Sequence, residues 1–173
     1  VTFVNNPNLS PEKSQTTELT AEKDLGHGLL RMTAFFEETK DAIVSQKSLL
    51  AGALETYIQN VGRIKSQGLE LAYSGNNVFT RGLDFSSSVT YVESRIKENP
   101  SQPDTIDKQQ IRVPVWRGNV LGNYRWNEQL SISLGARYAG RQFGQLNNSD
   151  INGFAYTGNS KLFVVDTRVL YRV

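Results

Sequence analysis

The sequence is poor in the residues on which most metal and redox chemistry depends. Its 173 residues include no cysteine, one histidine and one methionine. Without cysteine there is no disulfide framework and no thiolate metal site. The single histidine, His27, lies in the glycine-rich segment Asp24–Gly28, where a solvated turn residue is a simpler interpretation than a metal ligand. We therefore expect no bound cofactor and no resident metal.

The chain also lacks a long hydrophobic run and a dominant sign of charge. Hydrophobic residues make up 38% of the sequence, and no segment approaches the roughly 18 apolar residues that a spanning helix needs. The formal net charge is +2, with lysine and arginine scattered among acidic residues, so nucleic-acid binding has little support. These absences exclude a helical membrane protein. They do not exclude a membrane β-barrel, in which every second residue faces the interior.

No catalytic constellation stands out either. A Ser-His-Asp arrangement has little support because the only histidine lies in a turn. Glu37, Glu38 and Asp41 could form an acid–base group, but they lie among polar residues, where a solvated ribbon is the simpler explanation. A glycine-rich phosphate-binding motif is absent. The sequence is not expected to encode an enzyme.

What the sequence does contain is four segments in which apolar, aromatic or small residues occupy every second position. They run from Leu83 to Tyr91, Trp116 to Tyr124, Leu130 to Tyr138 and Phe163 to Tyr171. A period of two predicts β-strands, because successive side chains leave opposite faces of the pleat. Eight residues, tilted by about 40°, rise on the order of 20 Å, close to the lipid-facing band of an outer-membrane barrel. The pattern predicts strands with lipid on one side and water or polar protein on the other.

Seven strands are predicted along the chain, joined by connections of alternating length. The strands are about Ser14–Lys23, Leu29–Gln46, Thr56–Tyr73, Gly82–Lys97, Ile111–Arg125, Leu130–Phe143 and Leu162–Val173. Short connections are expected at Asp24–Gly28, Ser74–Arg81 and Trp126–Gln129, and longer ones at Lys47–Glu55, Glu98–Gln110 and Gly144–Lys161. Up-and-down barrels with tight periplasmic turns and long extracellular loops have this alternation. The second and third strands exceed the length of one membrane crossing, so their far ends are expected to project as a ribbon.

The aromatic residues of these strands sort into two rims. Tyr73, Tyr124, Trp126 and Tyr171 lie beside the short turns or near the chain's end, and Tyr91, Trp116, Tyr138 and Phe163 lie toward the long loops. Strand propensity alone favours aromatic residues. Their placement at both ends of several strands is more typical of the two interfacial girdles of a membrane barrel.

An ordered set of short motifs resembles one protein family. The segment Asn5-Asn6-Pro7-Asn8-Leu9-Ser10-Pro11-Glu12 is similar to the Asn-Pro-x-Leu-x-Pro-Glu segment of TonB-dependent outer-membrane receptors, where it leads from an extracellular loop into a barrel strand. Further matches follow in order: Phe35-Phe36 with Lys40–Ile43, then Asn60–Leu71, Gly135–Tyr138 and Val164–Asp166. Among these receptors, the siderophore type is the most similar.

The resemblance implies an all-β fold, an antiparallel up-and-down transmembrane β-barrel. About seven strands would be roughly a third of a 22-stranded barrel around a plugged lumen. Residues 1–173 are thus expected to be a partial β-barrel domain, with the signal peptide, the plug and the final strands lying outside it. The implied function is active transport of a metal chelate, such as a ferric siderophore, energised through TonB. The implied partners are the bilayer of the bacterial outer membrane, the protein's own plug domain, TonB and the metal–siderophore ligand.

Two groups of residues are candidates for contact with a ligand or the plug. The predicted lumen-facing set is Asp84, Arg117, Asn119, Arg137, Asp166 and Arg168. These polar residues could equally just solvate the barrel wall or form lateral ion pairs. A ligand entering from outside would first meet residues nearer the long loops, and this predicted set is Tyr57, Gln59, Arg141, Gln142, Phe143 and Tyr156. Arginine can present several fixed donors to an anionic chelate, and a neighbouring aromatic ring can grip it.

Two other classes of protein fit the same strand pattern. One is a passive porin-like barrel without a plug. The other is a soluble up-and-down barrel that holds a small ligand, for which the chain has a suitable length. The soluble barrel would turn its apolar stripe inward, so Val120, Leu134 and Val169 would lie in a sealed, dry centre.

Overall fold

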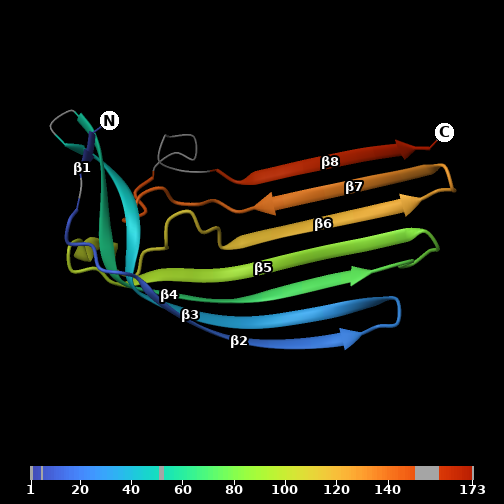
Figure 1. Ribbon diagram of the computed structural model, residues 1–173, viewed down its shortest axis with the longest axis horizontal. Helices are drawn as coiled ribbons and strands as arrows, with labels where there is room; N and C mark the ends of the chain where they lie inside the picture. Colours follow the sequence, from blue (N-terminus) through green and yellow to red (C-terminus); the bar gives the residue numbers. More distant parts are fainter. Residues whose placement is uncertain (1, 5, 51–52, 151–159, 173) are drawn as a thin grey trace.

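The protein forms one antiparallel sheet in which each strand pairs with the next along the chain. The computed structural model describes residues 2–4, 6–50, 53–150 and 160–172 (Figure 1). The strand order is β2-β3-β4-β5-β6-β7-β8, and a short strand, β1, pairs with β4 in parallel. The strands are β1 Thr2–Val4, β2 Lys13–Asp24, β3 Gly28–Leu50, β4 Ala53–Gly75, β5 Leu83–Glu98, β6 Trp116–Arg125, β7 Leu130–Ala139 and β8 Leu162–Tyr171. The predicted up-and-down order of seven strands is confirmed.

Tight turns join the strands at one end of the sheet. In the β2–β3 turn, Gly26 has a φ of 82° and its N–H donates to Asp24 Oδ1 at 2.7 Å. His27 is exposed in this turn. In the β6–β7 turn, Asn127 Oδ1 accepts from the N–H groups of Gln129 and Leu130 at 2.9 and 2.7 Å. Side-chain caps of this kind favour reversal within a few residues.

Longer connections lie at the opposite end, and one of them includes the short helical turn η1, Pro103–Thr105. Two predicted strand boundaries at this end are wrong. β6 begins at Trp116 rather than Ile111, because Arg112 has a φ of 61° and Pro114 has no N–H to donate to a ladder. β7 ends at Ala139 rather than Phe143. Within the described residues, no helix is long and apolar enough to cross a membrane.

The predicted ribbon of the second and third strands is confirmed and is longer than expected. β3 and β4 have 23 residues each and remain paired up to Leu50 and Ala53. The predicted long connection at Lys47–Glu55 is therefore wrong, since strand pairing continues through most of it. Asp41, with a φ of 54°, has no partner in the ladder, and here the ribbon turns away from the other strands (Figure 1).

The sheet has one apolar face and one polar face, and the register makes each continuous across the strands. We call the first the apolar face; its members at the centre of each strand are Leu19, Met32, Leu71, Val89, Val120, Leu134 and Val169. Val120, Leu134 and Val169 are 37%, 57% and 63% exposed. The soluble-barrel alternative required these side chains to be sealed inside, so it is excluded.

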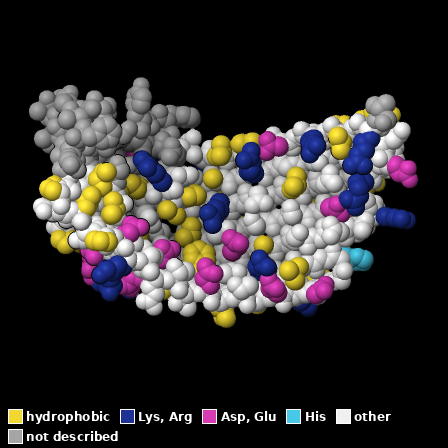
Figure 2. Space-filling view, in the orientation of Figure 1, with side chains coloured by type: hydrophobic (Ala, Val, Ile, Leu, Met, Phe, Trp, Pro, Cys, Tyr) yellow, Lys and Arg dark blue, Asp and Glu magenta, His cyan; other side chains and the backbone are white. Residues whose placement is uncertain are grey.

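The polar face consists of the intervening residues. Examples from successive strands are Glu18, Thr33, Glu70, Thr90, Asn119, Arg137 and Asp166. Figure 2 shows charged side chains spread over the strands on this side. Two faces of opposite character are what a wall between lipid and a watery interior requires.

The buried apolar side chains gather at the end with the long connections. Ala42, Val44, Val61, Ile64, Ile96, Ile111 and Leu146 form the main cluster among the described residues. Val61 and Ile96 are fully buried, and the cluster joins the β3–β4 ribbon to the β5–β6 and β7–β8 connections. The sheet itself, by contrast, leaves both faces open for other material to cover.

The N-terminal Asn-Pro segment is bound to the ribbon mainly through Asn60. Asn60 Oδ1 accepts from Ser10 N–H at 2.8 Å, and Asn60 Nδ2 donates to Ser10 O at 2.9 Å and Asp41 O at 2.6 Å. Glu12 Oε2 adds a bond from Ile43 N–H at 3.1 Å. These bonds explain why an asparagine suits position 60, because one amide side chain can both accept and donate hydrogen bonds.

Replacing Asn60 with alanine should therefore release the segment that precedes β2. Each lost hydrogen bond contributes about 1 kcal/mol net, so amide hydrogen exchange at Ser10 and Ile43 should accelerate at least tenfold. The control is Asn127→Ala, which removes two hydrogen bonds from the distant β6–β7 turn. Unchanged exchange at Ser10 in Asn60→Ala would contradict this role.

Candidate functional site

The six residues predicted to face the lumen all lie on the polar face. Asn119 pairs with Ser88 on one side and Arg137 on the other, while Asp166 pairs with Gly135 and Arg168 with Ser133. Asn119 Nδ2 donates to Ser88 Oγ at 2.7 Å. The structure thus brings this set onto one wall, which spans β5 to β8.

Three of these residues, Asp84, Arg137 and Asp166, take part in the lateral ion pairs that were the alternative interpretation. Arg137 Nη2 lies 3.0 Å from Asp166 Oδ2, and Arg125 forms a bidentate contact with Asp84. A guanidinium held by a neighbouring carboxylate is less available to a ligand. Within the described part of the chain, Arg117 and Arg168 have no such ion pair.

Arg117 lies where two hollows of the polar face meet. The upper hollow, toward the long connections, has a volume of about 340 Å³ and is lined by Glu12, Glu37, Ser94, Gln110 and Arg117, among others. The lower one, of about 560 Å³, is lined by Glu18, Glu22, Arg31, Glu70 and Arg117, among others. We call the upper hollow the vestibule. Arg117 is therefore placed to reach a molecule that moves from the vestibule into the lower hollow.

The wall opposite Arg117 is acidic, a feature that the sequence patterns did not single out. Glu37 accepts from Ser14 Oγ at 2.8 Å, and Glu70 accepts from Thr90 Oγ1 at 3.1 Å. Glu18 lines the same lower hollow. The register of β2, β3 and β4 places these carboxylates on the polar face. The concentration of one charge depends on which strands are neighbours, and alternation along a single strand does not show it.

Arg141 and Phe143 contact each other in the connection that follows β7. The Arg141 guanidinium lies 4.9 Å from the centre of the Phe143 ring, and its Nη2 donates to Asp150 O at 2.5 Å. Phe143 O accepts from Arg112 N–H at 2.9 Å, which joins this connection to the one before β6. Gln142, between them, is partly exposed. A contact of these residues with a ligand stays a prediction.

The other predicted ligand residues lie on the ribbon or outside the described part. Gln59 pairs with Val44 beside the buried cluster, and its Nε2 is buried without a described partner. The backbone of Tyr57 pairs with Gln46 and Val4, but the structure does not describe its side chain. Tyr156 lies outside the described residues altogether. Among the four whose side chains the structure describes, Arg141, Gln142 and Phe143 lie in the connection after β7 and Gln59 lies on the ribbon, and their contact with a ligand stays a prediction.

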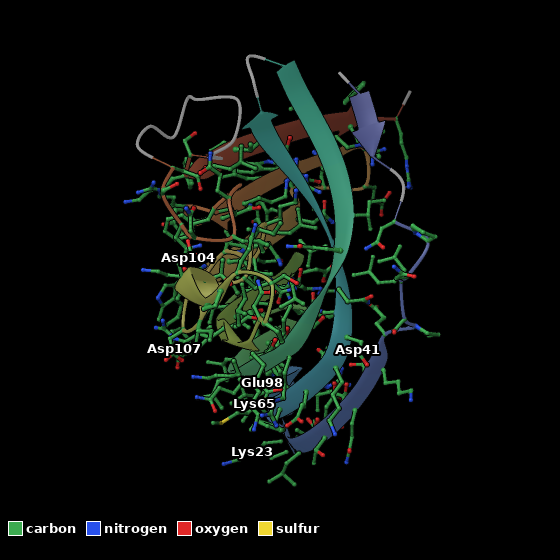
Figure 3. All side chains as sticks on the ribbon, turned by 90° about the vertical axis from the view of Figure 1, so that its left-hand side faces the viewer. Lys23, Asp41, Lys65, Glu98, Asp104 and Asp107 are labelled. Atoms are coloured by element: carbon green, nitrogen blue, oxygen red, sulfur yellow. The ribbon has the colours of Figure 1, made fainter. Side chains whose placement is uncertain are left out.

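Glu37, Glu38 and Asp41 do not come together as an acid–base group, the less favoured of the two interpretations of these residues. Glu37 faces Ser14 and Thr39 on the polar face, whereas Glu38 faces Lys65 on the other side of the sheet. Lys65 donates a hydrogen bond that lowers the pKa of Glu38, so this carboxylate is ionised near neutral pH. Asp41 lies at the bend of the ribbon (Figure 3). The solvated-ribbon explanation fits these positions.

The fold and the polar wall can now be compared with known proteins. The family model for the β-barrel of TonB-dependent receptor-like proteins matches residues 1–173. The chain belongs to the TonB-dependent receptor family. Its members are outer-membrane transporters rather than enzymes, which confirms the predicted location and class.

Three relatives show the range of the family. The chain is 27% identical over 154 residues to the probable TonB-dependent siderophore receptor PiuA of Acinetobacter baumannii, covering 84% of this chain and 20% of PiuA. It is 27% identical over 179 residues to the iron-regulated outer membrane virulence protein of Vibrio cholerae, covering 96% of this chain and 26% of that protein. It is 26% identical over 155 residues to the metal-pseudopaline receptor CntO of Pseudomonas aeruginosa, covering 85% and 20%.

The solved structure of the siderophore receptor PiuA shares the fold. Its TM-score is 0.73 at 23% identity, and the match covers 98% of this TonB-dependent receptor segment and 24% of the PiuA chain. The chain thus spans about a quarter or less of the length of the curated relatives it matches. The predicted partial barrel of antiparallel strands is confirmed as a fold.

Proposed function

We propose that this segment forms part of the barrel wall of an active-transport receptor for a metal chelate, of the ferric siderophore class, energised through TonB. The relatives include a probable siderophore receptor and a metal-pseudopaline receptor, which supports a chelated metal as cargo. The whole receptor would include a plug on the polar face and contact TonB through parts outside this chain. The barrel would act mainly as the frame within which the plug moves.

The observation that carries the proposal is the position of Arg117 beneath the vestibule. The vestibule opens at the end with the long connections, and Arg117 has no ion-pair partner in the part of the chain that the structure describes. Ferric siderophores have oxygen-rich, often anionic chelating groups, which a guanidinium can meet with several donors. Arg141 and Phe143 would contact such a ligand earlier, at the outer connections.

Transport is tested with the full-length protein that contains this segment. Cells expressing it should accumulate ⁵⁵Fe supplied as a siderophore complex only when TonB is present. Equal accumulation in strains with and without TonB would contradict energy coupling and favour a passive porin. No accumulation of any chelate tested in either strain, with the protein correctly inserted, would contradict the proposed cargo.

Arg117→Gln should weaken chelate binding to the full-length receptor about tenfold or more, the usual effect of losing a charged hydrogen bond. Binding is measured by quenching of intrinsic fluorescence. The control is Arg81→Gln, which removes the same charge from the exposed β4–β5 turn, at the end of the sheet away from the vestibule, and should leave the affinity unchanged. Equal affinity in Arg117→Gln and the unaltered protein would exclude Arg117 from the binding site.

A further inference from the structure

A group of charged residues lies on the apolar face, beyond its aromatic rim on the side of the long connections. Strand pairing places these residues on the same side of the sheet as the apolar face, so their side chains point away from the vestibule. We call it the outer charged belt; it consists of Lys13, Glu38, Lys40, Arg63, Lys65, Glu93 and Arg95. Figure 3 shows Lys65 near the base of the ribbon, on β4.

Most cations of the outer charged belt are neutralised by carboxylates. Lys65 Nζ lies 3.2 Å from Glu38 Oε2, and Arg95 Nε lies 2.6 Å from Glu93 Oε1. Arg63 forms an ion pair with Glu98. The hydrogen bond from Arg95 lowers the pKa of Glu93, as Lys65 does for Glu38, so both carboxylates are charged near neutral pH.

Lys13 and Lys40 are the exception. They are directly opposite each other in the β2–β3 register, both are exposed, and neither has an ion-pair partner among the residues that the structure describes. Like charges directly opposite in an antiparallel pair destabilise a sheet. An anion between the two ammonium groups would convert this repulsion into attraction.

The two lysines border a surface hollow whose other end is apolar. The hollow has a volume of about 510 Å³ and is lined by Lys13, Ser14, Gln15, Thr17, Phe36, Glu38 and Lys40. Phe36 is 41% exposed and belongs to the apolar face, where Met32 follows it toward the centre of the sheet. Lys40 is four residues beyond Phe36 along β3, which corresponds to roughly 13 Å of strand.

We propose that Lys13 and Lys40 together bind the phosphate of a lipid headgroup in the leaflet next to the long connections. The one carboxylate that lines the hollow, Glu38, is already paired with Lys65 and Arg63, so the two lysines leave the hollow positively charged and call for an anion. The continuity of the hollow with Phe36 and the apolar face calls for an anion attached to acyl chains. A soluble chelate moving along the polar face would be separated from these lysines by the sheet. The site is thus distinct from the vestibule and does not depend on the transported substrate.

The test uses the full-length protein in mixed micelles containing phosphatidic acid, with diacylglycerol as the lipid without phosphate. Native mass spectrometry counts the bound lipid. The unaltered protein should retain phosphatidic acid but not diacylglycerol. The double variant Lys13→Gln/Lys40→Gln should retain at least about tenfold less phosphatidic acid, because each lysine near a lipid surface contributes about 1 kcal/mol to binding. Lys40→Arg, which keeps the charge, should behave like the unaltered protein.

The matched control is Lys23→Gln/Lys108→Gln, which removes two exposed lysines, one beside the β2–β3 turn and one in the β5–β6 connection. It should retain phosphatidic acid normally. Equal retention by the Lys13/Lys40 double variant, or equal loss in the control, would overturn the site. Displacement of phosphatidic acid by an equal concentration of inorganic phosphate would overturn the lipid assignment, because the acyl part would then contribute nothing. Heat-modifiable migration on gels confirms that each variant is folded.

Discussion

Leu134→Arg should severely impair insertion and stability of the barrel, whereas Leu121→Arg should be tolerated. Leu134 lies at the centre of β7 on the apolar face and is 57% exposed, and Leu121, in β6, is 48% exposed on the polar face. An arginine facing the centre of the bilayer costs about 2–4 kcal/mol, while a residue facing the interior remains solvated. The measurement is urea unfolding of the full-length protein in lipid vesicles, with the yield of inserted protein as a second readout.

Leu134 and Leu121 are matched in their depth along the strands as well as in their side chain. Leu134 pairs with Gly122 and Leu121 pairs with Gly135, so the two leucines occupy adjacent rows of the same two strands. The difference between the variants therefore isolates the face. Equal destabilisation by both substitutions would contradict the assignment of the apolar face to lipid.

Gly68→Val should be strongly destabilising, because the backbone oxygen of Tyr91 and the ring of Phe35 occupy the space that a side chain would need. A Cβ built at Gly68 would lie 2.2 Å from Tyr91 O and 2.5 Å from Phe35 Cζ. Gly68 pairs with Phe35 in the β3–β4 ladder, so the ring covers the glycine across the strands. Overpacking of this kind costs roughly 1–3 kcal/mol and more where the backbone must move. The measurement is the shift of the urea unfolding midpoint of the full-length protein in detergent.

Gly122→Val provides the comparison for this variant. A Cβ at Gly122 meets only Leu83 Cδ1, at 3.9 Å, and the residue lies on the apolar face, where valine is favourable. Its unfolding midpoint should stay the same or rise slightly. A Gly68→Val protein as stable as Gly122→Val would contradict this account, because both the Tyr91 backbone and the Phe35 ring would then have to move without cost.

Local alternation was sufficient to predict the strands from β5 to β8. In those strands one face is apolar and the other polar, so a period of two is visible in each strand separately. The segment Ile111–Val115 shows the limit of this approach, because its alternating apolar residues also predict a strand. Ile111 instead lies in the buried cluster, and the left-handed Arg112 and Pro114 stop a ladder there. Apolar residues that are buried in a loop and apolar residues that line one face of a strand can show the same alternation in the sequence.

Features that depend on strand register could not be predicted from the sequence. Phe35 interrupts an otherwise polar face, and only its pairing with Gly68 explains why it is accommodated. The repulsive pair of Lys13 and Lys40 joins residues from two strands, and the vestibule needs loop positions that local propensity does not specify. Nearness to the long connections predicted the candidate ligand residues, and their contact with a ligand stays a prediction.

The central claim, that the apolar face meets lipid and the polar face meets water, can be tested most directly with single spin labels. The chain has no cysteine of its own, so once any cysteine elsewhere in the full-length protein has been replaced, a cysteine introduced within the chain is labelled at one known place. In the full-length protein in vesicles, labels at Val120, Leu134 and Val169 should be relaxed by oxygen, which concentrates in lipid. Labels at the neighbouring Asn119, Ser133 and Arg168 should be relaxed by a water-soluble nickel chelate. The reverse pattern, or the same pattern at both sets of positions, would contradict the account.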